Sequence, residues 1–86
     1  MIEEIFNSYP WYTKIKLLRV SKGWGQKKAG DMCLTYKKNY WLWEKGQCYP
    51  TLKNRKIIAA AFGININYIF SSNDQTLRDF KTTPKR

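Results

Sequence analysis

Few residues in this chain carry side chains suited to covalent or metal chemistry. The sequence contains two cysteines, Cys33 and Cys48, and no histidine. Two thiols cannot complete a four-ligand zinc site, and a cysteine nucleophile normally needs a histidine partner. The acidic residues are few and scattered, which is unsuited to paired carboxylate catalysis. We therefore expect no enzyme and no metal or cofactor, with Cys33 in the core and Cys48 in a loop.

The charged residues indicate a polyanionic partner instead. The chain has 86 residues and a net charge of +10. Residues 11–63 hold twelve Lys or Arg against two acids, Asp31 and Glu44, so this stretch carries the whole net charge. Such a domain favours nucleic acid first and an anionic membrane surface second. A surface that is basic only for solubility is the remaining alternative.

The sequence also predicts where the protein resides. No apolar run approaches the roughly 20 residues that a membrane-spanning helix needs. The first residues, Met-Ile-Glu-Glu, lack the basic start and apolar block of a signal peptide. We expect a cytoplasmic protein that does not enter a membrane. In that reducing compartment, a disulfide between Cys33 and Cys48 is not expected.

Hydrophobic periodicity predicts an all-α fold, a compact bundle of about five short helices. Trp11, Ile15 and Leu18 recur at helical spacing, which predicts a helix over residues 11–20 that Gly23 ends. Further helices are expected over residues 26–33, 36–45, 52–62 and 66–70. No segment alternates polar and apolar residues in the way that strands do.

Expected caps and core positions follow from the same pattern. Thr35, Thr51 and Asn65 are predicted N-caps, and Gly46 and Gly63 are predicted to end their helices. The residues expected to face the core after the first helix are Ala29, Met32, Cys33, Tyr40, Trp43, Leu52, Ile58, Ala59 and Phe62.

Several residues share a spacing that is specific when taken together. Gln26 follows Arg19 by seven residues, and Glu44 follows Gln26 by eighteen. Glu44 is followed by Lys45-Gly46 and then Pro50, and the pattern Ile-Ala-x-x-Phe-Gly-Ile spans residues 58–64. In this register, without a gap, residues 13–70 resemble the Cro/repressor-type (XRE-like) helix-turn-helix family of phage and bacterial transcriptional regulators.

The resemblance implies a lambda-repressor-like DNA-binding domain with a central helix-turn-helix, here residues 11–70. Residues 1–10 would be an N-terminal extension, and residues 71–86 a polar, basic, mobile tail. The implied function is a sequence-specific double-stranded DNA-binding regulator, a repressor that binds a palindromic operator as a homodimer. The alternative is a protein-interaction module, an antitoxin or mobile-element factor, in which DNA binding is secondary.

The resemblance also assigns roles to individual residues. Arg19 and Glu44 would form a structural ion pair between the first and third helices. The expected base-reading residues are Lys37, Lys38, Asn39 and Trp41. The expected DNA-backbone contacts are Gln26, Lys27, Lys28, Tyr36, Lys45, Lys53, Asn54 and Arg55. The expected dimer surface is Ile64, Ile66, Tyr68, Ile69 and Phe70.

Some of these roles have open alternatives. Lys37 and Lys38 would contact phosphates alone if they do not read bases. Trp41 is as well suited to dimer or core packing as to a thymine methyl group. Tyr36 would bond a phosphate or pack over the turn. Arg55 would turn toward a phosphate or lie on a solvated helix face, since its charge cannot be buried without a partner.

Three residues depart from the family pattern. Gly25 replaces the usual Ser or Thr cap, and Gly30 replaces the usual Ala, which keeps a small residue where two helices approach. Leu34 replaces the usual turn glycine, so the turn is expected to adopt a conformation that a branched side chain tolerates.

Overall fold

Five α-helices follow one another in the part of the chain that the computed structural model describes, residues 6–70. They are α2 (Trp11–Ser21), α3 (Gln26–Met32), α4 (Lys37–Glu44), α5 (Leu52–Phe62) and α6 (Ile66–Ile69), and these residues contain no strand. The predicted all-α class is therefore confirmed. The expected tail, residues 71–86, lies outside the described residues. No described helix combines the length and the hydropathy needed to cross a bilayer.

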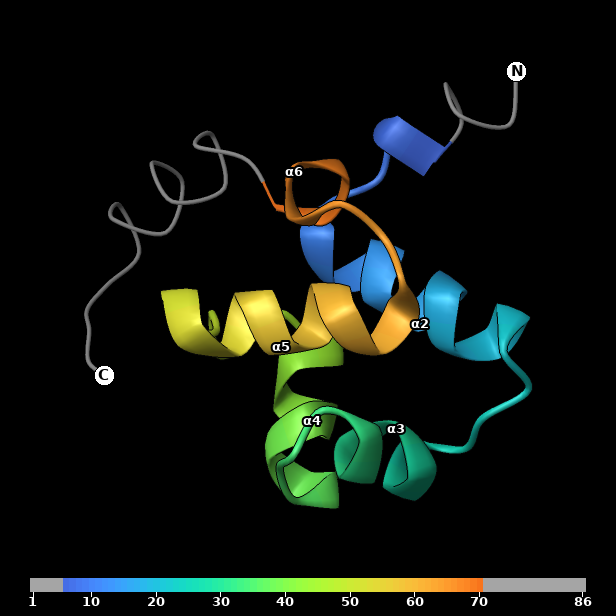
Figure 1. The fold of residues 1–86 in the computed structure, drawn as a ribbon, viewed down its shortest axis with the longest axis vertical. Helices are drawn as coiled ribbons and strands as arrows, with labels where there is room; N and C mark the ends of the chain where they lie inside the picture. Colours follow the sequence, from blue (N-terminus) through green and yellow to red (C-terminus); the bar gives the residue numbers. More distant parts are fainter. Residues whose placement is uncertain (1–5, 71–86) are drawn as a thin grey trace.

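The arrangement places α3 and α4 on one side of α5. In Figure 1, α5 crosses the middle, α3 and α4 lie below it, and α6 lies above it. Helix α2 contacts both α4 and α6, while α3 packs against α4 and α5 against α6. The helix that precedes the α3–α4 pair in sequence thus also supports it in space.

Two of the three predicted side-chain N-caps are present. The Thr51 hydroxyl accepts a hydrogen bond from the Asn54 N–H, 3.2 Å away, at the start of α5. The Asn65 side chain accepts one from the Asn67 N–H at 2.8 Å at the start of α6. Each bond satisfies a backbone donor that the helix itself leaves unpaired.

The third predicted cap, Thr35, is wrong. Helix α4 begins at Lys37, and its N-cap is Tyr36, whose backbone is extended (φ −84°, ψ 157°) and whose side chain makes no cap bond. The Thr35 hydroxyl instead accepts a hydrogen bond from the Asn39 side-chain amide at 2.8 Å. The helix starts one residue later than predicted because Tyr36 has not yet turned into the helical region.

All three predicted helix-ending glycines, Gly23, Gly46 and Gly63, adopt the left-handed conformation. Gly63 caps α5 with φ 70°, and Gly46, with φ 72°, follows the last turn of α4. Gly46 is also a point of close approach. A Cβ atom there would lie 2.8 Å from the Tyr12 ring, so a larger residue would have to displace that ring.

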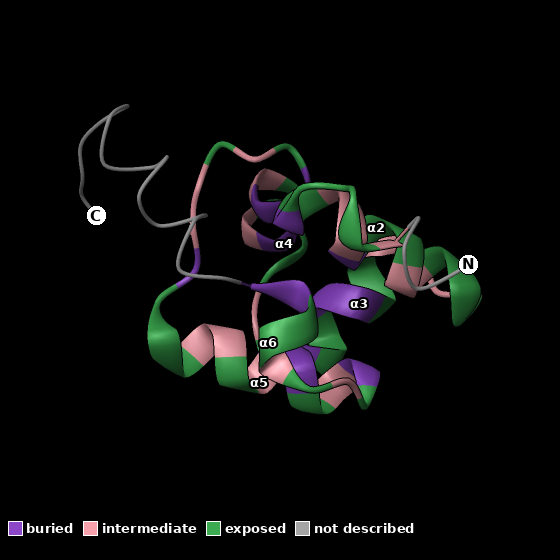
Figure 2. Cartoon of the chain, turned by 90° about the horizontal axis from the view of Figure 1, so that it is seen from above, coloured by how far each residue is buried: buried purple, intermediate pink, exposed green. Residues whose placement is uncertain are grey.

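The core lies where the helices face one another, as the purple positions in Figure 2 show. It consists of Trp11, Ile15, Ala29, Cys33, Tyr40, Trp43, Ile58, Ala59, Phe62, Ile69 and Phe70. Two predicted core residues are wrong, because Met32 is 41% exposed and Leu52 is 53% exposed. Gly30 lies on the buried side of α3. Met32 is two positions later, so its side chain lies on roughly the opposite side of the helix, toward solvent. Leu52 is the first residue of α5, whose buried residues lie in its later turns.

Two of the five residues predicted to form a dimer surface are buried within their own chain. Ile69 and Phe70 are buried at 1% and 3% exposure. The Phe70 ring lies 5.9 Å from the rings of both Trp11 and Tyr49. These two residues therefore close the core of their own chain and, in this structure, expose little surface. Ile64 and Ile66 are half-buried, and Tyr68 is 51% exposed.

Candidate nucleic-acid interface

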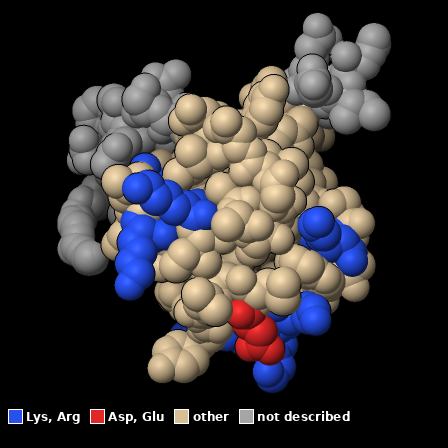
Figure 3. All heavy atoms as spheres, viewed as in Figure 1, with Lys and Arg blue, Asp and Glu red and all other residues tan. Residues whose placement is uncertain are grey.

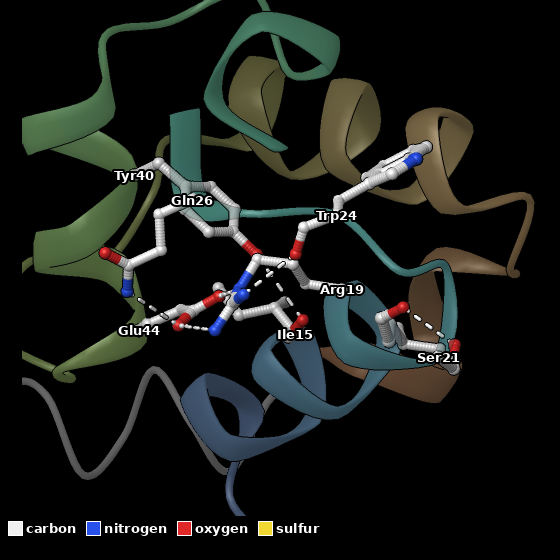
Figure 4. Close-up of polar contacts among 8 residues, drawn as sticks. Ile15, Arg19, Ser21, Trp24, Gln26, Tyr40 and Glu44 are labelled. Atoms are coloured by element: carbon white, nitrogen blue, oxygen red, sulfur yellow. Dashed lines mark hydrogen bonds and ion pairs between the residues drawn. The ribbon is translucent and has the colours of Figure 1, made fainter. Parts of the chain in front are cut away.

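One carboxylate joins three helices behind the exposed faces of α3 and α4. The Arg19 Nε donates to Glu44 Oε2 at 2.6 Å, and Arg19 Nη2 donates to Glu44 Oε1 at 3.3 Å. The Gln26 side-chain amide donates to the same Oε1 at 3.2 Å. Figure 4 shows Arg19 and Gln26 converging on Glu44 from opposite sides. The predicted ion pair is present, and it includes a third residue.

This cluster is shielded from solvent. The Arg19 and Glu44 side chains are 13% and 4% exposed. The hydrogen bond with Glu44 raises the pKa of Arg19 above its ordinary value, against the opposing effect of burial. Arg19 Nη1 also donates to the Trp24 carbonyl at 3.0 Å. The ion pair together with Gln26 therefore holds α2, α3 and α4 in position rather than offering a charge to a ligand.

Trp24 supports the same region and was not singled out by the sequence pattern. Its ring stacks on Phe62 with centroids 5.6 Å apart, which ties the α2–α3 connection to α5. The signal in the sequence was a large aromatic residue between Gly23 and Gly25, in a stretch that periodicity treats only as a helix break.

The connection between α3 and α4 contains the main departure from expectation. Leu34 has φ 60°, the left-handed region. The turn therefore adopts the glycine-type conformation even though leucine occupies it, which corrects the expected adjustment to a branched side chain. Gly30 lies close by, where a Cβ atom would be 3.2 Å from the Tyr36 carbonyl oxygen. The predicted close approach of the two helices at Gly30 is confirmed.

The first turn of α4 presents basic side chains to solvent. Lys37 and Lys38 are exposed, and neither forms an ion pair with an acid among residues 6–70. Asn39 is half-buried, and its amide donates to the Thr35 hydroxyl. The candidate readers Lys37 and Lys38 are thus free to reach a ligand, whereas Asn39 first has to release an internal hydrogen bond.

Two aromatic residues on α4 or its cap are exposed to different degrees. Tyr36 is 83% exposed, which excludes packing over the turn as its role in this structure. Trp41 is 37% exposed, so it is not a core residue. The Lys45 ammonium lies 5.3 Å from the Trp41 ring centroid, a cation–π contact that covers part of the ring.

The expected backbone-contacting residues on α3 and α5 vary in availability. Lys27 pairs with Asp31 at 3.1 Å, while Lys28 is exposed. Lys53 is exposed on the first turn of α5, next to Asn54. Gln26 donates inward to Glu44, so its amide is already engaged.

Arg55 packs against its own chain. Its Nε donates to the Pro50 carbonyl at 3.2 Å, and its guanidinium lies 5.0 Å from the Tyr49 ring centroid. The structure therefore places Arg55 against the loop before α5, which differs from both expected orientations. The loop carbonyl and the ring supply the partners that a half-buried cation requires.

The basic side chains do not form one continuous patch on the face seen in Figure 3. They form separate groups around its rim, and the lowest group, over α3 and α4, lies beside acidic atoms. Among the described residues, no cluster of three or more Cys, Asp or Glu is arranged to hold a metal ion. Burial raises the pKa of the Cys33 thiol to about 12, so it stays protonated at neutral pH.

Three comparisons with known proteins add no further identification. A scan against protein-family models, a search of curated proteins and a search of solved structures each found no match to this chain.

Proposed function

We propose that this protein is a sequence-specific double-stranded DNA-binding regulator, with α3 and α4 as a helix-turn-helix in a lambda-repressor-like domain. Helix α4 would enter the major groove as the recognition helix, and the protein would act in the cytoplasm as a repressor on a palindromic operator, bound as a homodimer. Lys37 and Lys38 would read bases, and the exposed Lys28 and Lys53 would contact phosphates.

The observation that carries the proposal is the cluster at Glu44. Arg19, Gln26 and Glu44 were the residues whose spacing suggested the register, and Glu44 lies 25 residues after Arg19 and 18 residues after Gln26. Their side chains nevertheless meet at one buried carboxylate. That meeting supports the register, and the register is what nominates Lys37 and Lys38 as readers.

The electrostatics give the proposal its physical basis. The described residues include twelve cations and two acids, and each acid forms an ion pair with a cation of the same chain. Lysines without an acidic partner add attraction to phosphates, and each phosphate contact releases bound counterions from DNA. Affinity for a duplex would therefore depend steeply on salt.

Binding-site selection from a random duplex pool, followed by a salt titration of the selected duplex, tests the proposal. We expect a symmetric site and a log–log salt slope of about −0.9 per phosphate contacted. Lys37→Ala should relax preference at one base pair and weaken the selected duplex by about 1–3 kcal/mol. Lys56→Ala is the matched control, because Lys56 is exposed on α5 outside the proposed contacts.

A slope near zero would contradict DNA binding and favour the protein-interaction alternative. If Lys37→Ala lowers the affinity for selected and for random duplexes equally, then Lys37 contacts phosphates and does not read a base.

A further inference from the structure

The turn between α3 and α4 exposes two large side chains that the fold does not use. Leu34 is 77% exposed and Tyr36 is 83% exposed, and we call these two residues the apolar tip. Neither side chain has a hydrogen bond, ring contact or charge contact within residues 6–70. With Asp31 and Thr35 they line one shallow, open hollow.

Leu34 is unfavourable for the free protein in two separate ways. Its apolar side chain is exposed to water, and its backbone has φ 60°, where the Cβ atom of an L-residue crowds the following carbonyl oxygen. Hydrogen bonds from Leu34 N to Asp31 O (3.1 Å) and from Thr35 N to Gly30 O (2.9 Å) hold the turn in this shape. Glycine would relieve both costs, so leucine at this position is explained better by a partner than by folding.

The charges around the apolar tip favour a polyanionic partner. The next two residues, Lys37 and Lys38, are exposed cations without an acidic partner in the described chain. Asp31 beside the hollow is neutralised by Lys27 at 3.1 Å. A partner that covers the apolar tip therefore also meets two unpaired positive charges.

Resting on the proposed function, we propose that Leu34 and Tyr36 contact thymine 5-methyl groups in the major groove of the bound duplex. The thymine methyl is the apolar group that a base edge offers there. RNA and uracil-containing DNA lack this group but keep the phosphates. The apolar tip thus selects thymine-containing DNA, while the neighbouring lysines supply sequence-independent attraction.

The test replaces each thymine of the selected duplex in turn with deoxyuridine, which removes only the methyl group. For the unaltered protein, we expect affinity to fall about three- to fivefold at one or two thymines, as the loss of one buried methyl predicts. Leu34→Gly should bind the thymine duplex more weakly by a similar factor and lose sensitivity to deoxyuridine at one of those positions. Its thermal midpoint should rise by several degrees, because glycine has no Cβ atom to crowd the left-handed turn.

Two further variants keep the test decisive. Tyr36→Phe should retain the deoxyuridine effect and Tyr36→Ala should reduce it, since the proposal assigns the contact to the ring. Leu52→Ala removes another exposed leucine, on α5, and should change neither affinity nor deoxyuridine sensitivity.

The outcomes separate this inference from the proposed function. A steep salt slope with no deoxyuridine effect at any position would overturn the apolar-tip contact and leave DNA binding standing. A deoxyuridine effect of the same size in Leu34→Gly and Tyr36→Ala would also overturn it. Absence of salt-dependent duplex binding would overturn both, and a protein ligand protecting Leu34 and Tyr36 would then replace DNA as the partner.

Discussion

At the residue scale, the Glu44 carboxylate is the point on which α2, α3 and α4 converge. It accepts hydrogen bonds from Arg19 and Gln26 and is almost fully buried. Replacing Glu44 with Ala would leave the Arg19 guanidinium without its counter-charge in a poorly solvated position. We expect Glu44→Ala to lower the free energy of unfolding by about 3–5 kcal/mol, measured by urea unfolding followed by circular dichroism.

Asp31 provides a matched control for this prediction. Its pair with Lys27 involves the same charge types at 3.1 Å, but the two side chains are 78% and 58% exposed. Asp31→Ala should therefore change the free energy of unfolding by no more than about 0.5 kcal/mol. Similar losses in the free energy of unfolding for Glu44→Ala and Asp31→Ala would mean that the buried ion pair stabilises the fold no more than the exposed one.

At the element scale, the distance between α3 and α4 depends on the missing side chain of Gly30. A Cβ atom at Gly30 would lie 3.2 Å from the Tyr36 carbonyl oxygen and 3.4 Å from the Lys37 Cα. The Tyr36 carbonyl accepts the first hydrogen bond of α4, from the Tyr40 N–H at 3.0 Å, so it cannot move independently of that helix.

Two opposing effects decide the outcome of Gly30→Ala. Helix propensity alone favours Ala by about 1 kcal/mol, whereas overpacking two fixed backbones costs about 1–3 kcal/mol. We expect a net loss of about 1 kcal/mol, seen as a lower urea midpoint with an unchanged m-value. A higher midpoint would show that α4 shifts at little cost and that the two helices are not held at this spacing.

At the scale of the whole molecule, stability should fall in alkaline solution. Burial raises the pKa of Cys33 from 9.0 to about 12, and burial together with the nearby Glu44 carboxylate raises the pKa of Tyr40 above its ordinary 10.0. The folded chain therefore holds these protons at a pH at which the unfolded chain releases them.

The free energy of unfolding should then be unaffected by these two groups below pH 9 and decline above it. The expected slope is about 1.4 kcal/mol per pH unit while Cys33 alone contributes, and about twice that once Tyr40 also ionises in the unfolded chain. Urea unfolding between about pH 8 and 11 measures this. Cys33→Ala should delay the onset by about one pH unit, and an unchanged onset would contradict the assignment to Cys33.

Much of this fold was predictable because it depends on local sequence. The helical spacing of Trp11 and Ile15 and the caps Thr51 and Asn65 act within one or two turns. Likewise, Gly63 ends α5 through its own backbone freedom. The Arg19–Glu44 pair was also predicted, although only through a family resemblance, because nothing local indicates that residues 25 positions apart will meet.

By itself, the sequence determined the charge of the chain, the all-α class, and the helix ends to within one residue, since these follow from composition, periodicity and local hydrogen bonding. Only the tertiary structure decided that Leu34 adopts the left-handed turn, that Phe70 belongs to the core, and that Arg55 rests on the loop before α5. The physical reason is that periodicity shows which residues share a face. Which of these faces becomes buried depends on residues that are distant in the sequence but pack against it. The backbone conformation of the connecting turns depends on the same packing.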